Sequence, residues 1–175
     1  MVHVAALDGY FGGLADAGFA AWRQVLDVNL IGTLQLTRAC LPALRERGGS
    51  VVIIGTQSAV AAPSQVRQAA YAASKGALTS AMYSLARELG PERIRVNTVL
   101  PGWMWGPAVE SYVSWTGRRR VGARGRRAGP ADGADGPAGA GHRRRGGGGR
   151  PVLASDRARA ITGQSLLVNA GEPMR

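Results

Sequence analysis

The sequence predicts an α/β fold built on a parallel sheet, and three observations carry the prediction. The runs V-V-I-I at 51–54 and I-R-V-N-T-V-L at 94–100 have the apolar, β-branched character of strands buried on both faces. The stretch between them, Tyr71–Leu89, repeats its apolar residues at helical spacing. This strand–helix–strand order is typical of a right-handed crossover between neighbouring parallel strands.

Further elements follow from the same reasoning. Phe19–Arg47 has an apolar stripe that predicts one long helix, with a possible kink at Gly32 in its middle. The apolar run Ser165–Val168 predicts a last strand at the far edge of the sheet. Val109–Trp115 has helical character, and a short helical stub is expected at 157–160.

The composition favours one soluble domain. A chain of 175 residues can bury a usable core. Cys40 is the only cysteine, which excludes an intrachain disulfide, and its apolar neighbours indicate a buried thiol. The sequence shows no signal-peptide pattern, no apolar run of about 18 residues and no metal-ligand pattern. We therefore expect a cytoplasmic protein that neither spans a membrane nor holds a metal.

The net charge of +11 would suit a nucleic-acid partner, but the charge is not spread over a face. Ten arginines and two aspartates give residues 117–150 a charge of +8, so the rest of the chain carries +3. The same residues include 12 glycines and one large aliphatic residue, Val121, so we expect 117–151 to lack order. Residues 1–116 and 152–175 then belong to one folded domain.

Tyr71, Lys75 and Ser58 form a candidate catalytic group. Tyr71 and Lys75 are four residues apart and share a helix face, and Ser58 follows the 51–54 strand, 13 residues before Tyr71. A nearby ammonium lowers the pKa of a phenol, which can then exchange a proton with an alcohol or carbonyl oxygen. A serine hydroxyl can hold the same oxygen. Lys75 is the only lysine among 22 basic residues, which draws attention to it. The alternative is that the pair is not functional, since a Tyr–Lys pair at this spacing also occurs by chance on exposed helices.

The run Y-A-A-S-K-G-A-L at 71–78, with L-A-R-E-L-G-P-E-R-I-R-V-N-T-V-L-P-G at 85–102, resembles the short-chain dehydrogenase/reductase family. The resemblance covers 1–107 and 152–171. It implies a Rossmann-like, doubly wound parallel sheet and NAD- or NADP-dependent hydride transfer between a small-molecule alcohol and a ketone or aldehyde. Tyr71 would be the acid/base, Lys75 the pKa-lowering and ribose-binding partner, and Ser58 the group that polarises the carbonyl. Asn29, in D-V-N-L-I-G-T, would anchor a proton relay, or would simply be a satisfied polar residue in a helix.

The resemblance also points to cofactor and substrate contacts after the 94–100 strand. Pro101 and Gly102 form the turn that abuts the nicotinamide in the family, at the carboxyl end of a strand where open α/β sheets bind ligands. A hydroxyl residue a few positions later usually holds the carboxamide in the family, but here Gly106 stands near that position, preceded by Trp103 and Trp105. They would form an apolar pocket wall or pack into the core.

Two departures from the family pattern stand out. The glycine-rich turn that binds the dinucleotide phosphates, with the first strands, is missing before the first helix, so we expect an incomplete sheet. The family's N-N-A-G motif is replaced by H-V-A-A at 3–6, where His3 is more often structural than functional.

Two other classes of function stay open. In the family the Phe19–Arg47 and Tyr71–Leu89 helices form the subunit interface, which implies a homo-oligomer. The chain could therefore be a non-catalytic partner of a full-length homologue. It could also bind RNA through its Arg/Gly-rich segment. Because glycine, arginine, alanine and proline codons are rich in G and C, a compensated shift of reading frame explains that composition better than a selected RNA-binding insert, and we expect nucleic acid not to be a partner.

Overall fold

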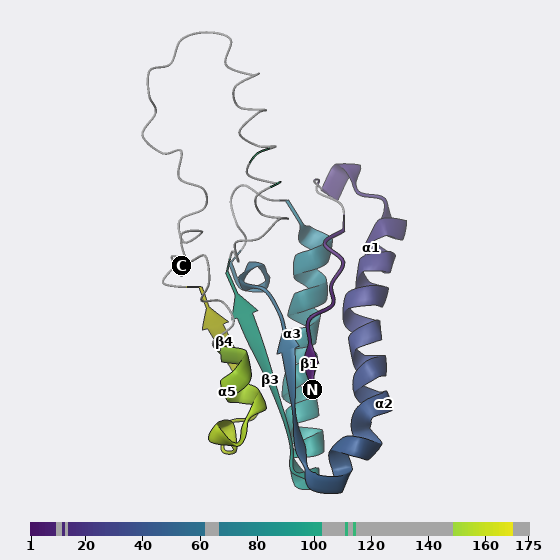
Figure 1. Cartoon of the computed structure of the whole chain (residues 1–175). Helices are drawn as coiled ribbons and strands as arrows, with labels where there is room; N and C mark the ends of the chain where they lie inside the picture. The colour runs from purple at the N-terminus through teal and green to yellow at the C-terminus, as the bar shows by residue number, and fades with distance from the viewer. Residues whose placement is uncertain are drawn as a thin grey trace, which may run out of the picture.

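The computed structural model describes residues 1–9, 12, 14–61, 67–102, 111, 114 and 149–169. Within these residues, four strands form one parallel sheet in the order β1-β2-β3-β4 (Figure 1). The strands are β1 (Val2–His3), β2 (Gly49–Ile54), β3 (Ile94–Pro101) and β4 (Ser165–Val168). The α-helices with described bounds are α1 (Phe19–Leu26), α2 (Gly32–Arg47), α3 (Ala69–Leu89) and α5 (Gly149–Ala154). Shorter turns of helix are η1 (Leu14–Asp16), η2 (Asp27–Ile31), η3 (Gln57–Ala59), η4 (Gly90–Glu92) and η5 (Asp156–Ala158).

The central strands confirm the sequence prediction. β2 and β3 pair in parallel from Gly49 opposite Ile94 to Ile54 opposite Val99, and α3 connects them. β4 pairs with the other side of β3 and forms an edge, as expected. The buried β-branched side chains of both strands explain why they take the middle of the sheet.

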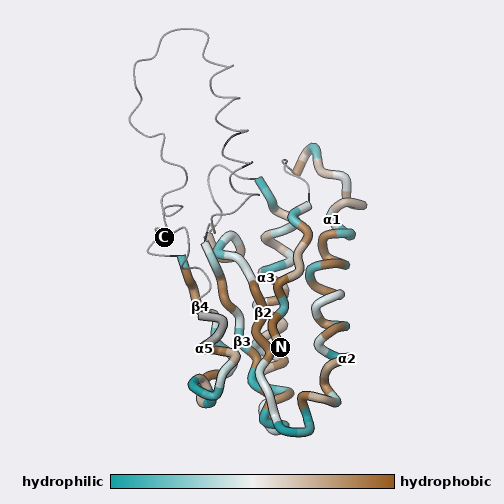
Figure 2. Tube along the Cα trace, viewed as in Figure 1, coloured by the Kyte–Doolittle hydropathy of each residue, from teal (hydrophilic) through white to brown (hydrophobic). Residues whose placement is uncertain are grey.

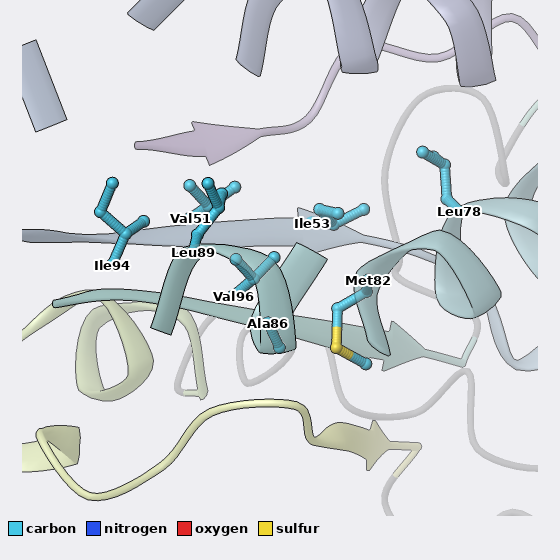
Figure 3. Packing of buried hydrophobic residues seen from close by; sticks show 8 residues of the cluster. All are labelled: Val51, Ile53, Leu78, Met82, Ala86, Leu89, Ile94 and Val96. Carbon is cyan, nitrogen blue, oxygen red and sulfur yellow. The ribbon is translucent and has the colours of Figure 1, made fainter. Parts of the chain in front are cut away.

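Helices cover both faces of this sheet. α2 and α3 pack on one face, where eight buried residues form the main cluster (Figure 3). They are Val51, Ile53, Leu78, Met82, Ala86, Leu89, Ile94 and Val96. α5 and η5 cover the opposite face with Leu153 and Ala158, over Val52, Ile54 and Val99. Most of β2 is accordingly coloured hydrophobic along the trace (Figure 2).

The long helix predicted over Phe19–Arg47 is present, and its irregular part is η2 rather than Gly32 itself. η2 is a π-helical turn that joins α1 to α2 without a break in the rod (Figure 1). π-turns insert one extra residue per turn and are frequent at functional sites. Asn29 lies inside this turn and is fully buried.

The C-terminal segment is fastened to β3 by side chains. Asn97 Nδ2 donates to the Ile161 carbonyl at 2.9 Å, and Asn97 Oδ1 accepts from the Gln164 N–H at 3.1 Å. Arg95 donates to the Leu153 carbonyl at 3.0 Å. These contacts hold β4 and α5 against β3, so the C-terminal segment packs on the same sheet as the N-terminal part of the chain.

Some predictions differ from the structure or lie outside it. α5 begins at residue 149, earlier than the expected return of order at 152, and the expected stub at 157–160 corresponds to η5. Trp103, Trp105 and most of the expected helix at 109–115 lie outside the described residues, as does 117–148. In the part of the chain that is described, no helix combines the length and apolar character needed to cross a membrane.

Candidate active site

Lys75 and Tyr71 lie on the same side of α3, at the carboxyl end of β2. Lys75 is 2% exposed, and its Nζ donates a hydrogen bond of 2.9 Å to the carbonyl of Ile54, the last residue of β2. The same Nζ is 6.0 Å from the centroid of the Tyr71 ring. The four-residue spacing thus brings the ammonium and the phenol together, as predicted.

Burial changes the acidity of both groups. Burial lowers the pKa of Lys75, and the carboxylate of Asp8 partly opposes this shift. Burial raises the pKa of Tyr71, Asp8 raises it further, and a hydrogen bond with the Thr56 side chain acts in the opposite direction. The sequence predicts that Lys75 brings the phenol pKa below its ordinary value. In this structure the phenol pKa is raised instead, because burial removes solvation from the phenol and the carboxylate of Asp8 disfavours the phenolate.

Asn29 joins three parts of the site. Its Oδ1 accepts the Leu7 N–H at 2.7 Å, and its Nδ2 donates to the Leu7 carbonyl at 2.9 Å and to Ser74 Oγ at 3.0 Å. Leu7 follows β1, whereas Ser74 lies beside Lys75 on α3. Asn29 therefore fixes the loop after β1 against the helix that bears Tyr71 and Lys75. Both amide hydrogens are used in these contacts, and its part in a proton relay stays a prediction.

Ser58 stands in η3, immediately beyond the end of β2, and is half-buried. Its backbone N–H donates to Thr56 Oγ1 at 3.2 Å. Among the described residues, the Ser58 hydroxyl makes no hydrogen bond to Tyr71, so its role in holding a carbonyl oxygen also stays a prediction. Pro101 and Gly102 end β3 at the same edge of the sheet, where the Gly102 N–H donates to the Val168 carbonyl at 3.2 Å.

Two residues near the phenol escaped the sequence analysis. Thr56 follows β2 by two residues, and Asp8 lies in the loop after β1. Gly9, next to Asp8, has a positive φ of 74°, and a Cβ there would meet Val25 Cγ2 at 2.5 Å. The loop is therefore closely held against α1. A polar residue just after a parallel strand is a positional signal that could have found Thr56, whereas Asp8 lies five residues beyond the end of β1.

The hydrogen bonds of His3 indicate a structural role. Its Nε2 lies 3.0 Å from Thr37 Oγ1, whose hydroxyl donates to the Thr33 carbonyl at 2.8 Å. Because that hydroxyl hydrogen is already used, Nε2 must carry the hydrogen of the imidazole. Burial lowers the His3 pKa, and the positive charges of the N-terminus and Lys75 lower it further. The neutral ring ties β1 to α2.

These features together define a class of site. A buried lysine and a half-buried tyrosine at the carboxyl edge of a parallel, helix-covered sheet provide proton exchange where open α/β sheets bind their ligands.

The comparisons identify the family. Residues 1–131 match a family model described as enoyl-(acyl carrier protein) reductase. The dehydrogenase/reductase SDR family member 4 of Pongo abelii is 32% identical over 185 aligned residues, which cover 100% of this chain and 59% of that protein. The L-fucose dehydrogenase of Bos taurus is 39% identical over 95 residues, covering 54% of this chain and 34% of its own. A solved oxidoreductase of the short-chain dehydrogenase/reductase family from Burkholderia thailandensis superimposes with a TM-score of 0.72 at 31% identity, covering 97% of this chain and 63% of its own.

The chain belongs to the short-chain dehydrogenase/reductase family, a family of oxidoreductases. Its fold is that of Rossmann-type members of the family, with four parallel strands described. It spans 59% of the length of the curated relative that it matches over its whole length.

Proposed function

We propose that this chain carries the proton-transfer half of an NAD- or NADP-dependent oxidoreductase that interconverts an alcohol with a ketone or aldehyde. The observation that supports this most is the position of Lys75 Nζ, bound to the Ile54 carbonyl and 6.0 Å from the Tyr71 ring. Tyr71 gives a proton to the carbonyl oxygen during reduction and takes it back during oxidation. Its raised pKa keeps the phenol protonated near neutral pH, the state that reduction requires.

The other residues complete the proposal. Ser58 holds the substrate oxygen, and Asn29 anchors the relay behind Lys75. A dinucleotide supplies the hydride when it is bound, and its nicotinamide–ribose end fits the residues at this edge. An ammonium has three N–H donors. One of those of Lys75 goes to Ile54, so two can serve ribose hydroxyls, and Pro101 and Gly102 would line the nicotinamide.

Replacing Tyr71 with Phe tests the assignment. Residual reduction of a panel of ketones and aldehydes by NADH and NADPH should fall by about 10²- to 10⁴-fold, because the proton donor is lost. Tyr83→Phe is a matched control, since Tyr83 lies on the same helix and is 52% exposed. Equal rates for the Tyr71→Phe variant and the original chain would remove Tyr71 from the mechanism.

We propose that cofactor binding by this chain is weak and that its turnover is low. The sequence lacks a strand–turn–helix segment with the glycine fingerprint that binds dinucleotide phosphates. Titration of NADH or NADPH, followed by nicotinamide fluorescence, should give a Kd weaker than about 100 μM, roughly −5.5 kcal/mol. A tighter constant would show that other residues replace the phosphate-binding turn.

We also propose that the chain self-associates through the long helix rod and α3, in a dimer or tetramer. Val28, Ile31 and Leu36 are 46%, 42% and 53% exposed on the rod. A helix that exposes several large apolar residues is typical of an interface.

Replacing both Ile31 and Leu36 with Lys should shift the mass measured by analytical ultracentrifugation toward the monomer. The control is Ile161→Lys, because Ile161 is 38% exposed and lies near β4. Mixing the chain with a full-length relative in the same experiment tests a role as its non-catalytic partner. An unchanged mass for the double variant would exclude this surface.

A further inference from the structure

Ser74 stands between Tyr71 and Lys75 on α3, and its side chain is buried, with 0% of the residue exposed. Its hydroxyl makes two hydrogen bonds. Oγ donates to the Tyr71 carbonyl at 2.7 Å and accepts from Asn29 Nδ2 at 3.0 Å. A serine hydroxyl has a single hydrogen, so Ser74 gives that hydrogen to Tyr71 and takes the second bond from the amide. The two bonds form a chain from Asn29 to the backbone of Tyr71.

The backbone of Tyr71 lies where α3 holds itself least. Tyr71 is the third residue of the helix, and the N–H groups of a first helical turn have no partner within the helix. Gln68, at the N-cap, makes no side-chain capping bond, and no acidic residue stands in the first turn. Helix ends fray, and a missing cap favours fraying. The residue proposed as acid/base therefore needs support from outside the helix ladder.

The bond from Ser74 reaches the carbonyl that links the two functional residues. In an α-helix each N–H is directed at the carbonyl four residues earlier, so the Lys75 N–H is directed at the Tyr71 carbonyl. A carbonyl has two lone pairs, and Ser74 uses the other one. The peptide geometry behind the 6.0 Å between Lys75 Nζ and the centroid of the Tyr71 ring is therefore held by a buried side chain as well.

The other end of this chain of bonds is fixed. Asn29 is fully buried in η2, and its amide binds the N–H and the carbonyl of Leu7 at 2.7 and 2.9 Å. The amide cannot rotate without breaking these two bonds, so the direction of its hydrogen toward Ser74 is set. That direction in turn orients the Ser74 hydroxyl toward the Tyr71 carbonyl.

We propose that Ser74 is a positioning residue of the active site, which transfers the hold of Asn29 to the Tyr71 carbonyl and keeps the phenol in place relative to Lys75. Its own side chain is buried and acts through Tyr71. The inference rests on the proposed role of Tyr71.

Two NMR signals that labelling makes unique test the inference without turnover. Tyr71–Ala72 is the only Tyr–Ala step in the sequence, so carbonyl-¹³C tyrosine combined with ¹⁵N-alanine gives one signal for the Tyr71 carbonyl. In Ser74→Ala this signal should move to lower ¹³C frequency, because the carbonyl loses a hydrogen-bond donor. Lys75 is the only lysine, and its side-chain signal senses the Tyr71 ring beside it. That signal should move part of the way to its position in Tyr71→Ala.

Ser74→Cys separates the hydrogen bond from the space that the side chain fills. A thiol is a weak donor, so the Cys variant should move both signals in the same direction as Ser74→Ala. The Tyr83 carbonyl is the control, since Tyr83–Ser84 is the only Tyr–Ser step and ¹⁵N-serine makes its signal unique. Tyr83 lies about 13 Å along the helix axis from Ser74, and its carbonyl signal should stay constant.

Circular dichroism shows that each variant is folded. A Tyr71 carbonyl signal that is equal in Ser74→Ala and the original chain would overturn the inference, and so would a Lys75 signal that stays constant while the carbonyl signal moves. A Cys variant that matches the original chain would mean that Ser74 only fills space. Equal shifts at Tyr71 and Tyr83 would contradict a local effect. None of these results touches the proposed function, which fails only if Tyr71→Phe leaves the rate unchanged.

Discussion

Replacing Asn29 with Leu should lower the free energy of unfolding by about 3–5 kcal/mol. The variant removes three hydrogen bonds: two with the N–H and the carbonyl of the half-buried Leu7, and one to the buried Ser74 Oγ, which still donates to the Tyr71 carbonyl at 2.7 Å. Each unsatisfied buried group costs about 1–3 kcal/mol, and a leucine side chain recovers only part of the sum. In a chain of 175 residues the melting temperature should fall by about 10 °C.

Urea unfolding followed by circular dichroism measures this change. Asp27→Ala is the control, because Asp27 lies in the same π-turn as Asn29 but is exposed, and such surface changes stay within about 0.5 kcal/mol. A similar loss in both variants would mean that the turn, and not the amide, is responsible. Stability equal to that of the original chain would show that Asn29 does not clamp the loop.

Replacing Leu78 with Ala should cost about 2–5 kcal/mol, because it removes a fully buried side chain from between α3 and the sheet. Leu78 lies one turn beyond Lys75 and packs in the cluster with Val51 and Ile53 (Figure 3). The cavity would also loosen the support under Lys75. Leu14→Ala removes the same atoms from a side chain that is 69% exposed and should change stability little. Equal losses in the two leucine variants would contradict the packing described for α3.

The sequence was sufficient to predict β2, β3, β4, α3 and the meeting of Tyr71 with Lys75. These follow from local patterns: apolar β-branched runs, helical spacing and a four-residue separation. It did not predict the sign of the Tyr71 pKa shift. That sign depends on how much solvent the fold removes from the phenol, and on Asp8, which lies far from Tyr71 in the sequence.

Nor did the sequence show what Asn29 contacts. Its partners are 22 and 45 residues away in the chain, and no local pattern encodes such pairings. The sequence motif predicts a functional role for Asn29. The structure shows that its amide also holds the loop that contains Asp8.

Lys75 offers the most direct test, because it is the only lysine in the chain and gives a single signal after selective ¹⁵N- or ¹³C-lysine labelling. NMR titration of that signal reports the charge of the side chain bound to Ile54 beneath the phenol. Burial should place the Lys75 pKa below the 10.5 of ordinary lysine, and Asp8→Asn should lower it further, since Asp8 opposes the shift. Between the lowered pKa and 10.5 the folded chain binds fewer protons than the unfolded chain, so stability should rise with pH there. A Lys75 pKa of 10.5 or above would mean that the ammonium is in solvent, and the proposed acid/base pair would not exist in this chain.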